Sequence, residues 1–246
     1  MDFASELAAG AAALGLVLNP EQVAALDAYR RVLLSWSRAM NLLGEPNEGA
    51  LLYKHLVDSL VYARAVGSAE SLVDIGSGNG LPGIVLKVVA PAMHVVLLES
   101  NVKRATFLSE AARAVGLDGL EVVCARAEDA GRDPAWRERF EVVVARRVAQ
   151  LNVLLEYALP LTKVGGRLVL AKGEGLEEEV AAAWGVPEML GGRLLTTLEV
   201  EAPPAAVAAG EPRVRRFVVV AKTALTPEAY PRRAGRASKK PLRGRP

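Results

Sequence analysis

The chain has 246 residues, of which 51% are hydrophobic and 24% are charged, and its formal net charge is +2. This composition is typical of a globular protein of one or two domains and excludes a mostly disordered chain. The single cysteine, Cys124, excludes an intrachain disulfide and a zinc site built from several cysteines. The uncharged stretch 7–20 is too short to span a bilayer and follows acidic residues, so we expect a cytoplasmic protein with no membrane partner.

Residues 1–65 are predicted to be a helical extension that packs on the rest of the protein. Apolar residues recur there at spacings of three and four, which makes one stripe along a helix: Leu26, Tyr29, Leu33, Trp36 and Met40. Pro20 suits the first turn of that helix. Residues 51–65 continue the helical period.

Residues 66–226 are predicted to form an α/β domain. Short apolar runs rich in β-branched residues predict strands at 71–75, 94–99, 120–124, 140–145 and 167–171, with helices between them at 81–89, 103–115 and 150–161. Repeated strand–helix units predict a parallel sheet with helices on both faces. The last two predicted strands, 193–200 and 213–222, are joined by an Ala- and Pro-rich connector without a convincing helix. We therefore expect seven strands, mostly parallel, with an antiparallel pair at one edge.

The last region, 227–246, is a basic tail. Between positions 229 and 246 it carries seven cations and no acidic residue, namely Arg232, Arg233, Arg236, Lys239, Lys240, Arg243 and Arg245. The rest of the chain has 23 basic and 28 acidic residues, so the body is mildly acidic. This asymmetry predicts a polyanionic partner, which from charge alone is RNA, DNA or acidic lipid. The tail has almost nothing to bury, so we expect it to be loosely ordered.

The main candidate site is the glycine-rich segment after the first predicted strand. Asp74 and Ile75 end that strand, and Gly76-Ser77-Gly78-Asn79-Gly80-Leu81-Pro82-Gly83 follows. In an open parallel sheet, ligands bind beyond the carboxyl ends of the strands. A dinucleotide site has G-x-G-x-x-G, whereas Leu81 stands at the third glycine position here. Asp74 would repel a pyrophosphate but suits an ammonium group, which favours S-adenosylmethionine as the cofactor.

Two further acidic positions follow neighbouring strands. Glu99 lies at the end of the second predicted strand, where a carboxylate can accept hydrogen bonds from both ribose hydroxyls. Ala127 and Glu128 follow the third strand, where Glu128 can accept from the exocyclic amine of an adenine. A ribose occurs in nicotinamide cofactors too, so Glu99 does not distinguish them.

Together these residues resemble the class I S-adenosylmethionine-dependent methyltransferases, and more closely the bacterial ribosomal small-subunit methyltransferase G family, also called glucose-inhibited division protein B. The resemblance covers the chain from about residue 30 onward. Besides the string DIGSGNGLPGI at 74–84, it is carried by Asn41-Leu42, His55-Leu56-Val57-Asp58-Ser59, Lys103-Arg104, Phe107-Leu108, Arg126-Ala127-Glu128, Arg146, Lys172-Gly173 and Tyr230-Pro231-Arg232. The resemblance implies a Rossmann-like fold and N7 methylation of a guanine in 16S ribosomal RNA near the decoding centre.

The resemblance implies cofactor contacts from Asp74, from residues 76–81, and from Glu99, Ala127 and Glu128. Arg146, which follows the fourth predicted strand, is the expected catalytic residue, and it either contacts the cofactor or reads the guanine. The family has S-R-A-x-A here, whereas this chain has Ala145-Arg146-Arg147-Val148-Ala149, so Arg147 stays open as the functional arginine. Because guanine N7 carries a lone pair and no proton, transfer needs no general base. We expect a monomer that acts on 16S ribosomal RNA or a small-subunit precursor and holds no metal.

Some alternatives stay open at this point. A small-molecule methyltransferase would have no evident use for the basic tail, and a nicotinamide-dependent oxidoreductase is disfavoured by Leu81 and Asp74. A non-catalytic RNA-binding factor is a third alternative. His55 and Asp58 are one helical turn apart and either lie at the mouth of the site or pair with each other to hold the N-terminal helices.

Overall fold

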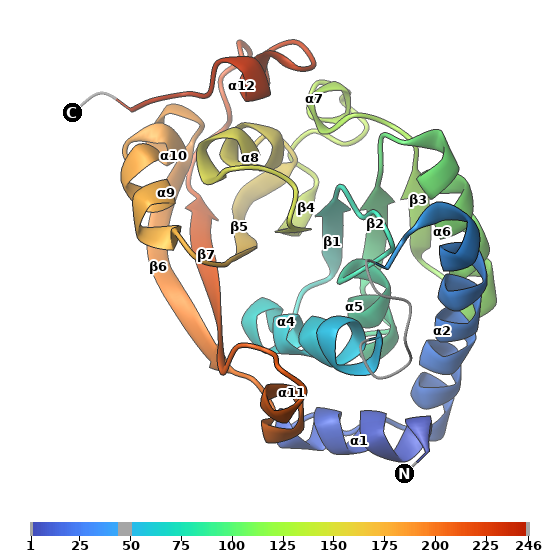
Figure 1. Cartoon of the computed structure of the whole chain (residues 1–246). Helices are drawn as coiled ribbons and strands as arrows, with labels where there is room; N and C mark the ends of the chain where they lie inside the picture. The colour runs from blue at the N-terminus through green and yellow to red at the C-terminus, as the bar shows by residue number, and fades with distance from the viewer. Residues whose placement is uncertain (1, 44–50, 245–246) are drawn as a thin grey trace.

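The computed structural model describes residues 2–43 and 51–244 and has three layers, a central sheet with helices on both faces (Figure 1). The seven strands lie in the order β3–β2–β1–β4–β5–β7–β6. Their bounds are β1 (Ser71–Ile75), β2 (His94–Leu98), β3 (Leu120–Val123), β4 (Phe140–Arg146), β5 (Thr162–Lys172), β6 (Gly192–Glu201) and β7 (Val214–Lys222). Strands β1 to β5 are parallel, and β7 is antiparallel to both β5 and β6. The predicted α/β fold with an antiparallel pair at one edge is confirmed.

Each face of the sheet has its own apolar layer, because successive residues of a strand point to opposite faces. Leu72 and Val142 belong to one layer, and their neighbours Val73 and Val143 belong to the other. The first layer includes α1 (Phe3–Ala13), α2 (Pro20–Met40), η1 (Leu51–Val57), α4 (Asp58–Val66), α5 (Gly83–Val89) and α6 (Val102–Val115). The second includes α7 (Ala127–Ala130), α8 (Leu151–Ala158), α9 (Leu176–Ala182) and α10 (Val186–Met189).

The N-terminal region is helical, as predicted. Helix α2 begins at Pro20 behind a capping box in which the side chains of Asn19 and Gln22 bond each other's backbone N–H groups. Its apolar stripe faces the core, where Tyr29 is buried, and its Trp36 packs edge-on against Phe107 of α6. Residues 51–57 form a π-helix, η1, instead of the regular helix expected there. Such segments are rare and occur frequently at functional sites.

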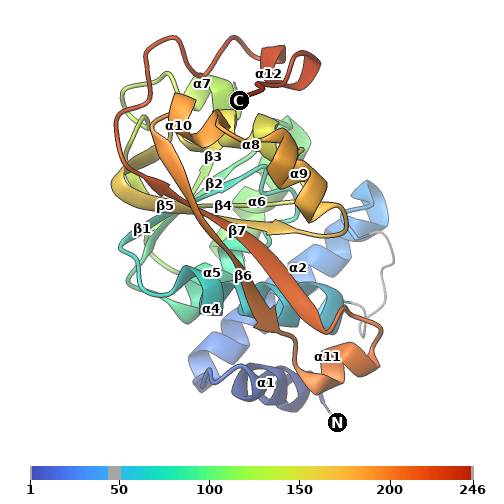
Figure 2. The ribbon, with the colours of Figure 1, turned by 90° about the vertical axis from the view of Figure 1, so that its left-hand side faces the viewer.

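Strands β6 and β7 form a long twisted arm along one side of the molecule (Figure 2). The connector between them contains a short helix, α11 (Pro204–Ala208), which we did not expect from the sequence. Ala206 of this helix is buried, and α11 lies against α1 and η1 at the end of the arm. The arm therefore joins the far edge of the sheet to the N-terminal helices.

The expectation of a loosely ordered tail is wrong for the described residues 227–244, because this segment is fixed to the body. Glu156 of α8 is 0% exposed and accepts hydrogen bonds from three donor groups of Arg232: from the backbone N–H at 2.8 Å, from Nε at 2.8 and 3.1 Å and from Nη2 at 2.6 Å. Arg137 donates to the carbonyl oxygens of Thr226 and Tyr230 at 2.6 and 2.9 Å. The composition of the tail indicates its charge but not its partner, because the anchoring carboxylate of Glu156 is 76 residues away in the sequence.

Candidate active site

The glycine-rich loop runs from Gly76 to Gly83 between β1 and α5, at the carboxyl end of the parallel strands. Gly76 has φ +64°, and a Cβ there would lie 2.9 Å from Cγ2 of Val148 in the loop after β4. A Cβ on Gly83 would lie 2.4 Å from Cδ2 of Leu97. Only glycine therefore allows this loop to pack so closely against β2 and the β4 loop.

Asp74 holds the end of the glycine-rich loop through its buried side chain. Its side chain is 1% exposed, and Oδ2 accepts a hydrogen bond at 2.9 Å from the backbone N–H of Gly83. Burial raises the pKa of the Asp74 carboxyl group to about 7, although the hydrogen bond from Gly83 acts the other way. Because Oδ2 bonds Gly83, Oδ1 is the atom that would contact the ammonium group of a cofactor, and this contact stays a prediction.

The other residues of the loop differ in which of their atoms remain available to a ligand. Ser77 is buried and donates from its hydroxyl to the carbonyl oxygen of Asp74 at 2.8 Å. The side chain of Leu81 is buried in the apolar layer, so only its backbone remains for a ligand. Asn79 is held by the N-terminal region: its carbonyl oxygen accepts from the Tyr29 hydroxyl at 2.5 Å, and its Nδ2 donates to the Leu42 carbonyl oxygen at 3.3 Å.

Glu99 is fixed beside the loop. It follows β2, which pairs in parallel with β1, and it is 5% exposed. Its Oε2 accepts from the N–H of Gly78 at 3.0 Å, and its Oε1 accepts from the N–H of Asn101 at 2.8 Å. Each carboxylate oxygen can accept a further hydrogen bond. The carboxylate is therefore held in one orientation by two backbone N–H groups.

A pocket opens beside Gly76 of the loop, at the carboxyl ends of the parallel strands. Its lining residues come from the ends of β1 and β2, from the segments after β2, β3 and β4, and from α7 and α8: Ile75, Gly76, Leu98, Ser100, Ala125, Arg126, Ala127, Glu128, Val148 and Tyr157. Both predicted adenine residues, Ala127 and Glu128, line it. Tyr157 was not singled out from the sequence, because its predicted helix gave no sign of facing a ligand. The lining combines apolar side chains with the acidic side chain of Glu128.

Arg146 ends β4 on the other side of β1, since Ala145 pairs with Ile75. Its Nη1 donates to Oδ2 of Asp58 at 3.0 Å. The other oxygen of Asp58 accepts from Nε of Arg215 in β7, and Arg215 also bonds Glu211. Arg147, the alternative arginine, has φ +57° and an exposed side chain. The structure thus brings Arg146 rather than Arg147 into the charged cluster.

His55 lies on η1 beside this cluster. Burial, followed by the charges of Arg146 and Arg147, lowers the pKa of the His55 imidazole to about 4, so it is neutral at physiological pH. Within the described part of the chain, its buried Nδ1 has no hydrogen-bond partner. Asp58 bonds the two arginines, so the alternative in which His55 and Asp58 pair to hold the helices is not what the structure shows.

Lys172 fixes the loop that follows Arg146. The side chain is mostly buried, and Nζ donates to the Ala149 carbonyl oxygen at 2.9 Å and to Oε2 of Glu179 at 2.7 Å. The same oxygen of Glu179 accepts from the N–H of Leu151 at 2.6 Å. Residues 149–151 are therefore held from α9, a helix that the sequence analysis did not predict.

Residues 2–43 and 51–244 contain no group of three or more His, Cys, Asp or Glu side chains that could hold a metal ion. None of the helices described is both long and apolar enough to cross a membrane.

The strand order, the glycine-rich loop after β1 and the acidic residue after β2 define a class I methyltransferase fold. Solved structures agree at the level of the fold. A mutant of MtNAS in complex with S-adenosylmethionine matches with a TM-score of 0.52 and 18% identity, covering 81% of this chain and 72% of that one. A branched-chain polyamine synthase mutein from Thermus thermophilus matches with a TM-score of 0.52 and 15% identity, covering 80% and 64%.

The sequence narrows this class to one family. The model of the rRNA small subunit methyltransferase G family matches residues 22–206. The ribosomal RNA small subunit methyltransferase G of Symbiobacterium thermophilum is 41% identical, covering 95% of each chain. The protein of the same name from Roseiflexus castenholzii is 40% identical, covering 96% of this chain and 99% of its own. The chain therefore belongs to the rRNA small subunit methyltransferase G family, as its motifs predicted.

Proposed function

We propose that this protein transfers the methyl group of S-adenosylmethionine to N7 of a guanine in 16S ribosomal RNA, near the decoding centre and in the cytoplasm. Membership of the family supports the reaction and the RNA. The observation that carries the proposal is the position of Arg146. It ends β4 next to the glycine-rich loop, so a base that it holds would lie beside the methyl donor.

The residues present fit S-adenosylmethionine. Glu99, with both oxygens oriented by backbone N–H groups, would accept from the ribose hydroxyls. Ala127 and Glu128 would flank the adenine, and the backbone of residues 76–81 would carry the methionine part. The bound cofactor supplies an electrophilic methyl group. Asp74 would act mainly through the loop, because its carboxylate already bonds Gly83.

The protein's task toward the guanine is to position it. N7 has a lone pair and no proton to remove, so catalysis requires N7 to be held in line with the methyl group at near-attack distance. Guanine O6 lies beside N7 and is an acceptor that an arginine can read, which leaves the N7 lone pair free for the methyl group. Arg146 uses Nη1 on Asp58, and the remaining N–H groups of its guanidinium are the donors proposed for O6.

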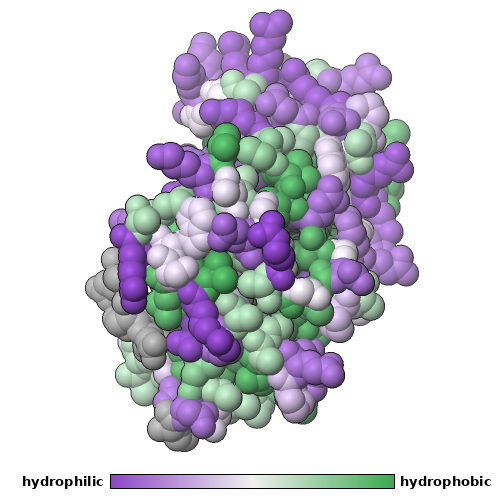
Figure 3. All heavy atoms as spheres, turned by 90° about the vertical axis from the view of Figure 1, so that its right-hand side faces the viewer, coloured by the Kyte–Doolittle hydropathy of each residue, from purple (hydrophilic) through white to green (hydrophobic). Residues whose placement is uncertain are grey.

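The surface supports RNA rather than a metabolite as the substrate. Five tail cations, namely Arg233, Arg236, Lys239, Lys240 and Arg243, are exposed, and within the described residues they have no acidic partner. The end of the molecule that carries the tail is covered largely by hydrophilic residues (Figure 3). A concentration of unpaired cations beside the site is the expected footprint for phosphates.

Mass mapping of 16S ribosomal RNA tests the proposal. Small subunits from a strain lacking this protein are incubated with the purified protein and labelled S-adenosylmethionine, and the products are digested and mapped. We expect one N7-methylguanine near the decoding centre. A label on a ribose hydroxyl, a cytosine carbon or a ribosomal protein would refute the guanine-N7 assignment. The Arg146→Ala protein is the matched control for contaminating enzymes.

A further inference from the structure

We propose that the C-terminal tail is a working part of the cofactor site, because its residues Gly235 and Ser238 position the side chains that form the wall of the adenine pocket. The inference rests on the proposed function, since it takes the pocket beside Gly76 to be the adenine site. It adds a second role to the polyanion binding that the charge of the tail predicts.

The first observation concerns Glu128. This side chain lines the pocket and is 3% exposed. Its Oε1 accepts a hydrogen bond at 2.8 Å from the backbone N–H of Gly235. A buried carboxylate without such a donor carries a large desolvation penalty. The tail amide therefore holds the Glu128 side chain in the orientation in which it can accept from an adenine amine.

The second observation concerns Tyr157, which lines the same pocket from α8. Burial raises the pKa of the Tyr157 phenol, and the Glu128 carboxylate adds to this, whereas a hydrogen bond with Ser238 of the tail lowers it. The tail helix α12 (Arg236–Lys239), which carries Ser238, packs against α8. Glu128 and Tyr157 therefore both lie beside the same segment of the tail.

The third observation is that the tail is anchored beside these contacts. Arg232 bonds the buried carboxylate of Glu156, the residue before Tyr157. Arg132, which follows α7, donates from Nε to the carbonyl oxygen of Pro231 at 2.7 Å. Both helices that supply pocket walls, α7 and α8, are thus tied to the tail at residues 231–238.

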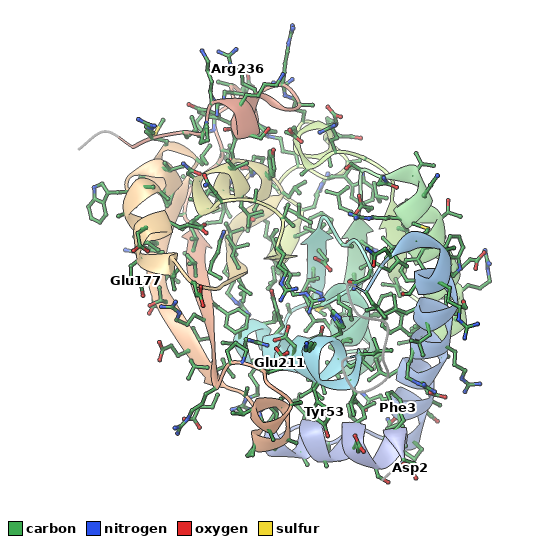
Figure 4. All side chains as sticks on the ribbon, in the orientation of Figure 1. Asp2, Phe3, Tyr53, Glu177, Glu211 and Arg236 are labelled. Carbon is green, nitrogen blue, oxygen red and sulfur yellow. The ribbon has the colours of Figure 1, made fainter. Side chains whose placement is uncertain are left out.

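The charged side chains of the tail point to solvent and not into the pocket. Arg236 of the short helix α12 (Arg236–Lys239) lies on the outer side of the tail, at the opposite end of the molecule from Asp2 (Figure 4). The contacts with the pocket come from a backbone N–H and a hydroxyl, whereas the five exposed cations defined above face solvent. The two roles can therefore be separated by mutation.

The experiment compares two full-length or nearly full-length variants by calorimetric titration with S-adenosylhomocysteine and with its inosine counterpart, which lacks the exocyclic amine. One variant ends at Arg233, which keeps the Arg232–Glu156 anchor and removes Gly235 and Ser238. The matched control replaces the five exposed cations by Gln and keeps the backbone. We expect the truncated protein to bind the adenosine ligand about tenfold more weakly and to lose most of its preference for the amine. The control should keep both.

Melting temperatures show whether the truncated protein is folded. A milder variant, Gly235→Val, addresses the same contact, because a β-branched residue is strained at φ +76° while its Cβ would meet open space. In a Glu128→Gln background, either change should add little, since the tail acts through Glu128. Wild-type affinity and amine preference in folded truncated and Gly235→Val proteins would overturn the inference. A wild-type protein that binds neither ligand would instead overturn the proposed function.

Discussion

Asp58 and Arg146 are 88 residues apart in the sequence, yet Arg146 donates from Nη1 to Oδ2 of Asp58 at 3.0 Å. Arg215 bonds the other oxygen of the same carboxylate. The strand β7 is thereby linked through Asp58 to the arginine proposed to read the guanine. Glu211, which lies near the end of the β6–β7 arm by the N-terminal helices, is the second partner of Arg215 (Figure 4).

Asp58→Asn should slow methylation while cofactor affinity stays near the wild-type value. The change removes the negative charge that orients Arg146, and hydrogen bonds to charged groups contribute about 1.5–3 kcal/mol. Single-turnover rates should fall about tenfold. Asp27→Asn is the control, because Asp27 bonds Arg30 and Arg31 on the surface of α2. A tenfold loss of cofactor affinity in Asp58→Asn would place Asp58 in the cofactor site instead.

Arg146→Ala should reduce the rate of methyl transfer at least tenfold with little change in melting temperature. A hydrogen bond from a charged donor to guanine O6 contributes about 1.5–3 kcal/mol, and Asp58 keeps Arg215 as a partner after the change. Arg147→Ala is the matched comparison and should stay near the wild-type rate. If the two variants behave the other way round, Arg147 is the functional arginine.

Glu99→Ala should weaken S-adenosylmethionine binding by a factor of about ten to a hundred. The variant lacks the acceptor for the ribose hydroxyls, and the N–H of Gly78 also loses its partner. Glu121→Ala, at an exposed position of β3, is the control. Calorimetric titration measures both. Unchanged affinity in Glu99→Ala would remove Glu99 from the proposed site.

Replacing the five exposed tail cations by Gln should weaken RNA binding and its dependence on salt. If all five met phosphates, the log–log slope against salt would lessen by about 3.5 units, at about 0.7 per contact on single strands. Arg232 is left in place, since it bonds the buried Glu156. Filter binding across a salt series gives the slope, and an unchanged slope would show that RNA does not meet these residues.

His55 should make the protein less stable in mild acid. The unfolded imidazole takes up a proton near pH 6.5, whereas the folded one does so near pH 4. Between these values the unfolded state binds more protons, so the free energy of unfolding falls as the pH is lowered, by up to about 3 kcal/mol. The contribution is fully present above pH 6.5. Asp74, whose pKa is raised to about 7, acts in the opposite direction over the whole of this range.

Comparison of variants isolates the histidine. Denaturant unfolding between pH 7.5 and 4.5 measures the free energy of unfolding of both proteins. As the pH is lowered, this free energy should fall for the wild type relative to His55→Gln. His94→Gln is the control, because His94 is the other histidine of the chain and is exposed at the start of β2. An identical pH dependence in His55→Gln and wild type would contradict the lowered pKa.

The strands and the main loop were predictable from sequence because they depend on local patterns. Strand β1 was predicted with its observed bounds, and the glycine-rich loop follows it as expected. Strand β5 starts at Thr162, five residues before the predicted start, because Gly165 and Gly166 interrupt the apolar pattern. The short helices α9 and α10 were not predicted, because each has fewer than two turns.

Contacts between distant segments were not predictable. Nothing in the sequence near Glu156 or Glu128 indicates that their partners are in the tail, 76 and 107 residues later. The cation count of the tail suggested a single electrostatic role. The actual arrangement depends on which carboxylates are buried, and burial is decided by the packing of α7 and α8.

The order of the strands has a consequence for synthesis of the protein. Strand β7 is made after β6, yet it lies between β5 and β6. In a growing chain, β6 therefore cannot join the sheet until β7, which ends at residue 222, has left the ribosomal tunnel. Asp58 likewise lacks its partner Arg215 until that strand emerges. Because Arg215 bonds Asp58 and Gly235 bonds Glu128, the contacts around the proposed site are complete only after residue 235 has emerged.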